Sequence, residues 1–228
     1  MSCLARARVF LTMRVEIWSD LACPWCHLGR RRFEIALASF PHRDEVEVVW
    51  RAFELDPSAP AVYEGDRVER LARKYGSSRE QAERVQRHIA EQGVQDGAEF
   101  RFDRVRDGNT FDAHRLTKLA AAHDLADPMN ERLFRARFAE GVLLSDHSQL
   151  ERLAAEVGLP GDEAGEVLAG DRFADEVRAD EQLAVELGIN AVPFFLADRA
   201  IGASGAHPPE ILGRLLERGW EARPSAVV

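Results

Sequence analysis

Two short stretches near the start of the chain alternate polar and apolar residues, and a helix-like pattern lies between them. Arg14-Val-Glu-Ile-Trp18 and Glu45-Val-Glu-Val-Val-Trp50 have the two-residue period of strands. Apolar residues recur with helical spacing over residues 28–40, and Pro41 ends this pattern. Because strand, helix and strand at this spacing form a βαβ unit, we expect the two strands to be parallel.

The long middle of the chain, residues 58–187, has an almost wholly helical periodicity. Three helix starts carry capping signals. Ser77-Ser-Arg-Glu80 and Ser148-Gln-Leu-Glu151 have the capping-box pattern, and Asp127 precedes Pro128 as a candidate N-cap residue. The pattern therefore predicts a large helical segment between two ends that are rich in β-structure.

The last part of the chain returns to β-character. Val192-Pro-Phe-Phe-Leu196 predicts a strand, Ala200-Ile-Gly-Ala203 a short partner strand, and Pro208 to Glu217 a terminal helix. The simplest architecture is an α/β fold in which both ends of the chain share one sheet. The expected division is 13–57 for an N-terminal βαβ part, 58–187 for a helical insertion and 188–228 for a C-terminal ββα part.

Composition narrows the choice of partners. The 228 residues carry a formal net charge of −9, which argues against nucleic acid or an anionic membrane as the main partner but leaves room for a local basic patch. No apolar run is long enough for a transmembrane helix. Met1 to Met13 are too charged for a secretory signal, so we expect a cytoplasmic protein that starts at Met1 or at Met13. We interpret Cys3, in this leader, as incidental to the chemistry.

The strongest chemical signal is Cys23-Pro-Trp-Cys26, between a predicted strand and a predicted helix. If the helix starts at Cys23, both sulfur atoms lie on its first turn, where they can close a small disulfide ring. The free N–H groups and the positive dipole end favour a thiolate at Cys23. Pro24 fits a first helical turn, and Trp25 adds an apolar ring beside the sulfur.

A cysteine pair at this spacing allows a full exchange cycle. Cys23 attacks a substrate disulfide, and Cys26, which we expect to be the more buried thiol, resolves the mixed disulfide. The alternative is half of a zinc site. Zinc usually takes four ligands, and Cys3 is the one cysteine left, so no metal is predicted.

Val192-Pro193 stands just before the predicted third strand. On its own it indicates a trans proline that opens a strand. A cis peptide bond would instead expose the backbone of Val192 for pairing with an extended substrate. The cysteine motif and the βαβ pattern favour this second interpretation.

Four motifs together resemble a known family. They are Cys23-Pro-Trp-Cys26, Asn109-Thr-Phe-Asp-Ala-His-Arg115, Asn190-Ala-Val-Pro-Phe194 and Ser204-Gly-Ala-His-Pro-Pro-Glu210. In this order, over almost all of the chain from Met13 to Trp220, they look like the DsbA-like thioredoxin superfamily and most like its cytoplasmic FrnE-type subfamily. The resemblance implies a thioredoxin-like fold with a large all-helical insertion.

The resemblance also assigns roles to individual residues. It implies Cys23 as nucleophile, Cys26 as resolving thiol and Pro193 as a cis-proline that faces them. Pro24, Trp25 and Val192 are then the expected substrate-binding residues.

Other polar residues carry weaker signals. Asp112, His114 and Arg115 are candidates to line a cleft, although Asp112 and Arg115 also have the spacing of an ordinary helical ion pair. We expect His27 to be a solvated helix residue, and Arg30-Arg31-Arg32 to form a salt-bridged helix face.

The expected function is a thiol–disulfide oxidoreductase acting on protein, peptide or small thiol substrates. Its redox centre is the Cys23–Cys26 disulfide, and glutathione is a candidate small partner. Two other functions stay open: a glutathione-dependent transferase or isomerase of the kappa-class or 2-hydroxychromene-2-carboxylate isomerase type, and a redox-regulated holdase. The first of these branches has serine where Cys23 stands, so the two cysteines favour dithiol redox chemistry. The sequence leaves the direction of exchange and the oligomeric state open.

Overall fold

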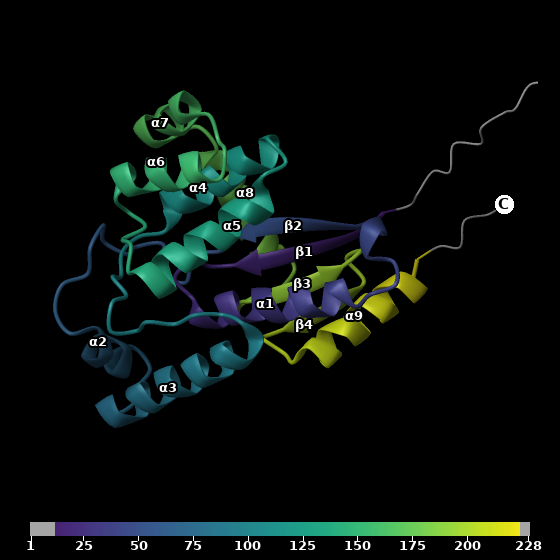
Figure 1. Ribbon diagram of the computed structural model, residues 1–228, viewed down its shortest axis with the longest axis horizontal. Coiled ribbons are helices and arrows are strands. Elements are labelled where there is room, and N and C mark those ends of the chain that lie inside the picture. Colours follow the sequence, from purple (N-terminus) through teal and green to yellow (C-terminus); the bar gives the residue numbers. More distant parts are fainter. Residues whose placement is uncertain (1–11, 224–228) are drawn as a thin grey trace, which may run out of the picture.

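A four-stranded sheet forms the centre of the computed structural model, which describes residues 12–223 (Figure 1). The strand order is β2-β1-β3-β4, with β1 (Met13–Ser19) and β2 (Val46–Ala52) parallel. β3 (Phe194–Ala197) is antiparallel to both β1 and β4 (Ile201–Ser204). The two ends of the chain therefore share one sheet, and the parallel pairing expected from the sequence is confirmed.

The central strand β1 is buried on both faces. Val15 and Ile17 pack with side chains of α1 (Pro24–Ala38) and α9 (Pro209–Glu221), which cover one face of the sheet. Trp18 points the other way and packs with Ala184 of α8 (Ala174–Glu186). Because side chains alternate along the strand, β1 contributes to the apolar cores on both faces of the sheet.

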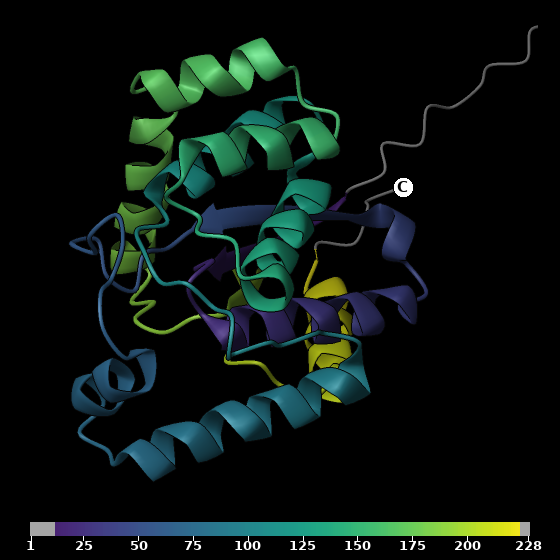
Figure 2. The same ribbon diagram turned by 60° about the vertical axis from the view of Figure 1, so that its left-hand side comes forward.

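The segment between β2 and β3 is helical and lies in two places (Figures 1 and 2). α2 (Arg67–Lys74) and α3 (Arg79–Asp96) lie below α1, and α3 contacts it. The remaining helices gather on the opposite side: α4 (Phe111–Ala122), α5 (Ala126–Arg135) with its π-helical continuation η2 (Ala136–Glu140), α6 (His147–Glu156), α7 (Gly161–Ala169) and α8. Their apolar core continues into the cysteine motif. A short 3-10 turn, η1 (Arg43–Glu45), precedes β2.

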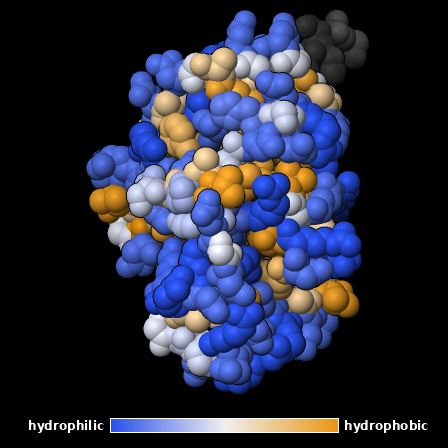
Figure 3. Space-filling model, turned by 90° about the vertical axis from the view of Figure 1, so that its left-hand side faces the viewer, coloured by the Kyte–Doolittle hydropathy of each residue, from blue (hydrophilic) through white to orange (hydrophobic). Residues whose placement is uncertain are grey.

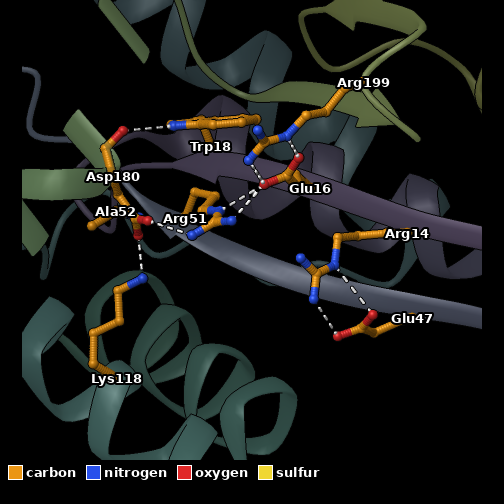
Figure 4. A network of polar contacts seen from close by, with 9 residues as sticks. All are labelled: Arg14, Glu16, Trp18, Glu47, Arg51, Ala52, Lys118, Asp180 and Arg199. Carbon is orange, nitrogen blue, oxygen red and sulfur yellow. Dashed lines mark hydrogen bonds and ion pairs between the residues drawn. The ribbon is translucent and has the colours of Figure 1, made fainter. Parts of the chain in front are cut away.

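Polar contacts fasten α8 and α4 to the edge of the sheet (Figure 4). The buried carboxylate of Asp180 accepts hydrogen bonds from Arg51 and from the N–H of Ala52, both at 2.8 Å, and pairs with Lys118. Its backbone oxygen accepts from the Trp18 indole at 3.0 Å. One residue of α8 therefore holds two strands and a neighbouring helix together.

Glu16, also on β1, is a second buried carboxylate in this layer. Burial alone raises the pKa of Glu16, but hydrogen bonds and charge from Arg199 and Arg51 outweigh it, and the pKa is lowered. The carboxylate is therefore ionised and paired at neutral pH.

None of the three helix-start signals was placed correctly. Ser148 lies inside α6, whose N-cap residue is Asp146. The capping box of α3 uses Ser78 and Gln81, one residue later than expected. Asp127 lies inside α5, where its side chain accepts from Arg30 at 3.1 Å and from the Trp50 indole at 3.2 Å. Asp127 is not an N-cap because tertiary partners use its carboxylate.

Among residues 12–223, no helix is long and apolar enough to cross a membrane.

Candidate active site

The two cysteines lie where β1 leads into α1. Helix α1 begins at Pro24, and Cys23 is its N-cap residue with extended backbone angles. The N–H of Cys26 donates to the carbonyl of Cys23 at 3.1 Å, which keeps both residues on the first turn. Both thiols are free, with Cys23 at 5% and Cys26 at 1% exposure, in the expected order of burial.

The surroundings of the two thiols differ. Burial raises the pKa of Cys26 well above its ordinary value, and the hydrogen bond and charge of Cys23 raise it further. The backbone of Asp20 and the hydroxyl of Ser19 oppose this effect only in part. Cys26 is therefore a protonated thiol at neutral pH.

Val192 and Pro193, just before β3, lie close to Cys23. The Val192–Pro193 peptide bond is cis, and the carbonyl oxygen of Val192 lies 3.8 Å from the Cys23 sulfur, as a hydrogen-bond acceptor for the thiol. Pro193 is buried against α1, where a Cβ on Gly29 would lie 2.7 Å from its ring. Glycine at this position therefore allows α1 and the β3 loop to approach closely.

A cavity of about 690 Å³ opens beside Cys23. Apolar side chains gather in a band across the middle of the molecular face shown in Figure 3. Pro24 and Trp25 line the cavity, as expected of substrate-binding residues, whereas Val192 is not part of its lining. Its size is that of a small-molecule or peptide site.

The polar residues expected to line a cleft lie elsewhere. His114 and Arg115 are buried, and neither they nor Asp112 line the cavity. Arg115 pairs with Asp112 at 2.7 Å and donates to the carbonyls of Gly170 and Arg172 beyond α7. The cleft interpretation was therefore wrong for Asp112 and Arg115, because the Arg115 side chain satisfies carbonyl groups at the end of a helix. His114 lines a small second pocket between β2 and α4 instead.

Asp20 is the buried carboxylate next to the cysteine motif. It accepts from the N–H groups of Ala22 and Leu55 and from the Thr110 hydroxyl, and His114 lies 3.7 Å away. Burial alone raises the pKa of Asp20, but the charge of His114 and the backbone donors outweigh it and lower the pKa. The carboxylate is thus ionised beneath the cavity.

His27 is not solvated, contrary to expectation. It is 5% exposed, and its ring stacks on Phe134 and Phe138, with centroid distances of 5.3 and 5.7 Å. The helical insertion supplies both phenyl rings, which local sequence could not reveal.

The salt-bridged helix face expected for the neighbouring arginines is confirmed. Arg30 and Arg31 pair with Glu34, and Arg32 pairs with Asp96 at 2.7 Å.

Several cavity residues carry no signal strong enough to be singled out in the sequence. They are Tyr63, Arg67, Arg70, Asp107 and Arg137. Arg67 and Arg70 have the spacing of one helix face. That spacing is equally typical of a solvated surface, so it does not indicate a site.

A metal site would need further ligands beside the cysteines. Within the part of the chain that the structure describes, no group of three or more His, Cys, Asp or Glu side chains could hold a metal ion. Structural zinc normally requires four such ligands.

Comparison with known proteins agrees with the fold. The family model described as a DsbA-like thioredoxin domain matches residues 14–217. An uncharacterized protein of Bacillus subtilis, YwbO, is 31% identical over 200 residues, which cover 86% of this chain and 92% of that protein. The fold class expected from the sequence is confirmed.

Solved structures include similar chains. The crystal structure of a probable DsbA oxidoreductase from Streptomyces coelicolor is 44% identical, with a TM-score of 0.89 over 95% of this chain and 93% of that chain. A cytosolic disulfide reductase from Pseudomonas aeruginosa, DsbM, is 20% identical, with a TM-score of 0.64 over 92% of this chain and all of that chain. The second likeness shows the shared fold alone.

Proposed function

Because the chain belongs to the family of DsbA-like thioredoxin domains, we propose that it is a thiol–disulfide oxidoreductase whose redox group is the pair Cys23 and Cys26. The observation that carries the proposal is the asymmetry of this pair. Cys23 is the N-cap residue of a helix and lines the cavity, whereas Cys26 is outside the cavity lining and has a raised pKa. A nucleophile needs access to substrate, and a resolving thiol needs protection from it.

In the direction of reduction, the Cys23 thiolate attacks one sulfur of a substrate disulfide. A mixed disulfide forms, and the other substrate sulfur leaves as a thiolate. Cys26 then loses its proton and attacks the Cys23 sulfur, so that the Cys23–Cys26 disulfide forms and the second substrate thiol is released. Two electrons pass from the dithiol to the substrate, and an external thiol restores the reduced pair. Oxidation of a substrate dithiol follows the same steps in reverse.

Two features support the first step. The unpaired N–H groups at the start of α1 favour negative charge at its N-cap, where Cys23 lies. The Val192 carbonyl beside the sulfur belongs to a short segment that can pair with an extended substrate backbone. Pro24 and Trp25 offer apolar contact on the cavity side.

The test uses insulin reduction by dithiothreitol, with Cys3→Ser as the background so that two thiols remain. We expect Cys23→Ser to abolish catalysis and Cys26→Ser to accumulate mixed disulfides that mass spectrometry detects. Full turnover by the Cys23→Ser variant would refute the proposal. Activity with glutathione that survives Cys26→Ser would favour the transferase or isomerase instead, and aggregation suppression by the double serine variant would favour a holdase. The cytoplasmic location and the FrnE-type subfamily remain predictions.

A further inference from the structure

The lining of the cavity beside Cys23 has a small net positive charge. Its lining has four cationic side chains, Arg67, Arg70, Lys74 and Arg137, against the carboxylates of Asp20, Asp56 and Asp107. The whole chain, in contrast, has a formal net charge of −9. A positively charged cavity in an acidic protein indicates an anionic ligand.

The excess is concentrated around Asp107. Arg67, Arg70 and Arg137 all pair with this one carboxylate, at 3.2 Å for Arg67 and 2.7 Å for Arg137. Three guanidinium groups therefore share one negative charge. Burial lowers the pKa of Arg137, and the nearby Arg67 acts in the same direction, so a further anion would stabilise the cluster.

The other two cavity carboxylates form no direct ion pair with these three arginines, because their nearest hydrogen-bond partners are neutral groups. Asp20 accepts from the backbone of Ala22 and Leu55. Asp56 accepts from the Tyr63 hydroxyl and from Ser58. Three guanidinium groups thus face one carboxylate within the Asp107 cluster, while Asp20 and Asp56 keep their negative charges and the whole lining, four cations against three carboxylates, has a net charge of +1.

The arginines are held in place and retain donor capacity. Arg137 is 2% exposed and lies on the π-helical turn η2, a type of distortion that is frequent at functional sites. Its Nε and the Nη1 of Arg67 are buried without a hydrogen-bond partner. Arg70 lies over the ring of Tyr63, 4.6 Å from its centroid, and is 21% exposed.

We propose that the Asp107 cluster binds a carboxylate of the substrate, and that the preferred substrates are disulfides that carry such a carboxylate near the reacting sulfur. This inference rests on the proposed function, since the same cavity presents Cys23 to the substrate. Two kinds of substrate could supply this carboxylate: a small acidic disulfide, or a peptide disulfide with an acidic side chain beside its cysteine.

The experiment measures single-turnover reduction of matched disulfides by the reduced protein. The probes are dithiodipropionate and dithiodibutyrate, each compared with its neutral diamide, and a peptide disulfide with Glu beside the cysteine, compared with its Gln counterpart. Each rate is divided by the rate of the same disulfide with dithiothreitol, which removes differences in intrinsic reactivity. We expect the wild type to favour the carboxylate about tenfold, the effect of one hydrogen bond to a charged group.

Variants locate the preference. Arg67→Gln/Arg70→Gln leaves the Asp107–Arg137 pair intact and is expected to bring the preference close to one, while Arg70→Gln alone reduces it about threefold. The control is Arg73→Gln, which removes the same positive charge from an exposed position on the same helix. We expect this variant to keep the full preference. A preference for the small acids but not for the Glu peptide would identify a small-molecule substrate, and the reverse a peptide.

Two outcomes separate this inference from the function on which it rests. Equal rates for acids and amides, in a reaction that Cys23→Ser abolishes, would overturn the carboxylate site and leave the oxidoreductase proposal standing. A preference that Arg73→Gln weakens as much as Arg70→Gln would also overturn it. If no disulfide reacts, the proposed function itself fails.

Discussion

The buried imidazole of His27 makes a sharp prediction about stability in acid. The ring lies between α1 and two phenyl rings of the helical insertion, and it is 5% exposed. Burial lowers the pKa of His27 from 6.5 to about 3, and the charges of Arg30 and Arg31 act in the same direction. The folded protein therefore keeps a neutral histidine through mildly acidic pH.

The sign of the effect follows from proton uptake. Below pH 6.5 the unfolded chain binds a proton at His27 that the folded chain does not bind. The contribution of the neutral His27 to the free energy of unfolding is therefore fully present above this pH, and it is lost as the pH decreases toward about 3. At pH 5 the loss is about 2 kcal/mol, because the unfolded pKa lies 1.5 pH units higher and each unit corresponds to about 1.4 kcal/mol. This value depends little on the folded pKa, which lies well below pH 5.

The perturbation is His27→Phe, which keeps an aromatic ring in the stack and removes the titration. Urea unfolding at pH 7, 6 and 5 gives the free energy of unfolding of wild type and variant. We expect the variant to gain about 2 kcal/mol relative to wild type between pH 7 and pH 5, whatever its offset at pH 7. The other titrating groups cancel in this difference.

The control is His88→Phe on α3, where the imidazole is exposed to water in the folded as in the unfolded chain. A difference between wild type and His27→Phe that stays constant from pH 7 to pH 5 would refute the reasoning. It would mean that the buried ring takes up a proton without cost, or that the stack opens.

Two further predictions concern buried groups. Asp180→Ala should lower the free energy of unfolding by about 3–5 kcal/mol, since it leaves Lys118 and the Ala52 N–H without this partner and leaves Arg51 with Glu16 alone. Asp175→Ala, exposed on the same helix, should cost below about 1 kcal/mol, and similar urea midpoints for both variants would contradict the role of Asp180. In the Cys23→Ser variant, alkylation of Cys26 by iodoacetamide should be slow at neutral pH and its rate should still increase above pH 9, because burial raises the pKa of this thiol. A rate that levels off near pH 8 would show that the pKa is not raised.

The sequence predicted what depends on short stretches of chain. The two-residue period of β1 and β2 follows from the alternation of side chains between the two faces of the sheet, and the helical period between them from the buried side of α1. The parallel pairing follows from the short connection through α1. The Cys23–Cys26 spacing also depends on one short stretch of chain, and it correctly predicted that both thiols lie at the start of this helix.

Residues whose environment comes from distant segments were predicted less well. His27 was expected in solvent, but phenyl rings more than a hundred positions later enclose it. Arg67 and Arg137 read as ordinary charged positions until the fold brings them to one carboxylate. A helical period identifies the polar side of a helix, but it does not show whether that side faces water or a cavity.

Asp20 shows how such distant segments are set relative to the reactive sulfur. Its carboxylate accepts from Ala22, just before Cys23, at 2.8 Å, from Leu55, after β2, at 2.7 Å, and from Thr110, before α4, at 3.0 Å. These three segments line the same cavity, so one buried anion fixes their mutual position. The Asn109–Arg115 motif thus contributes through Thr110, whose hydroxyl donates to Asp20 beneath the cavity, whereas Asp112 and Arg115 pair with each other outside the cavity lining. Because the segments share one acceptor, a shift in any of them would leave a buried donor unpaired, which costs more than the hydrogen bond contributes.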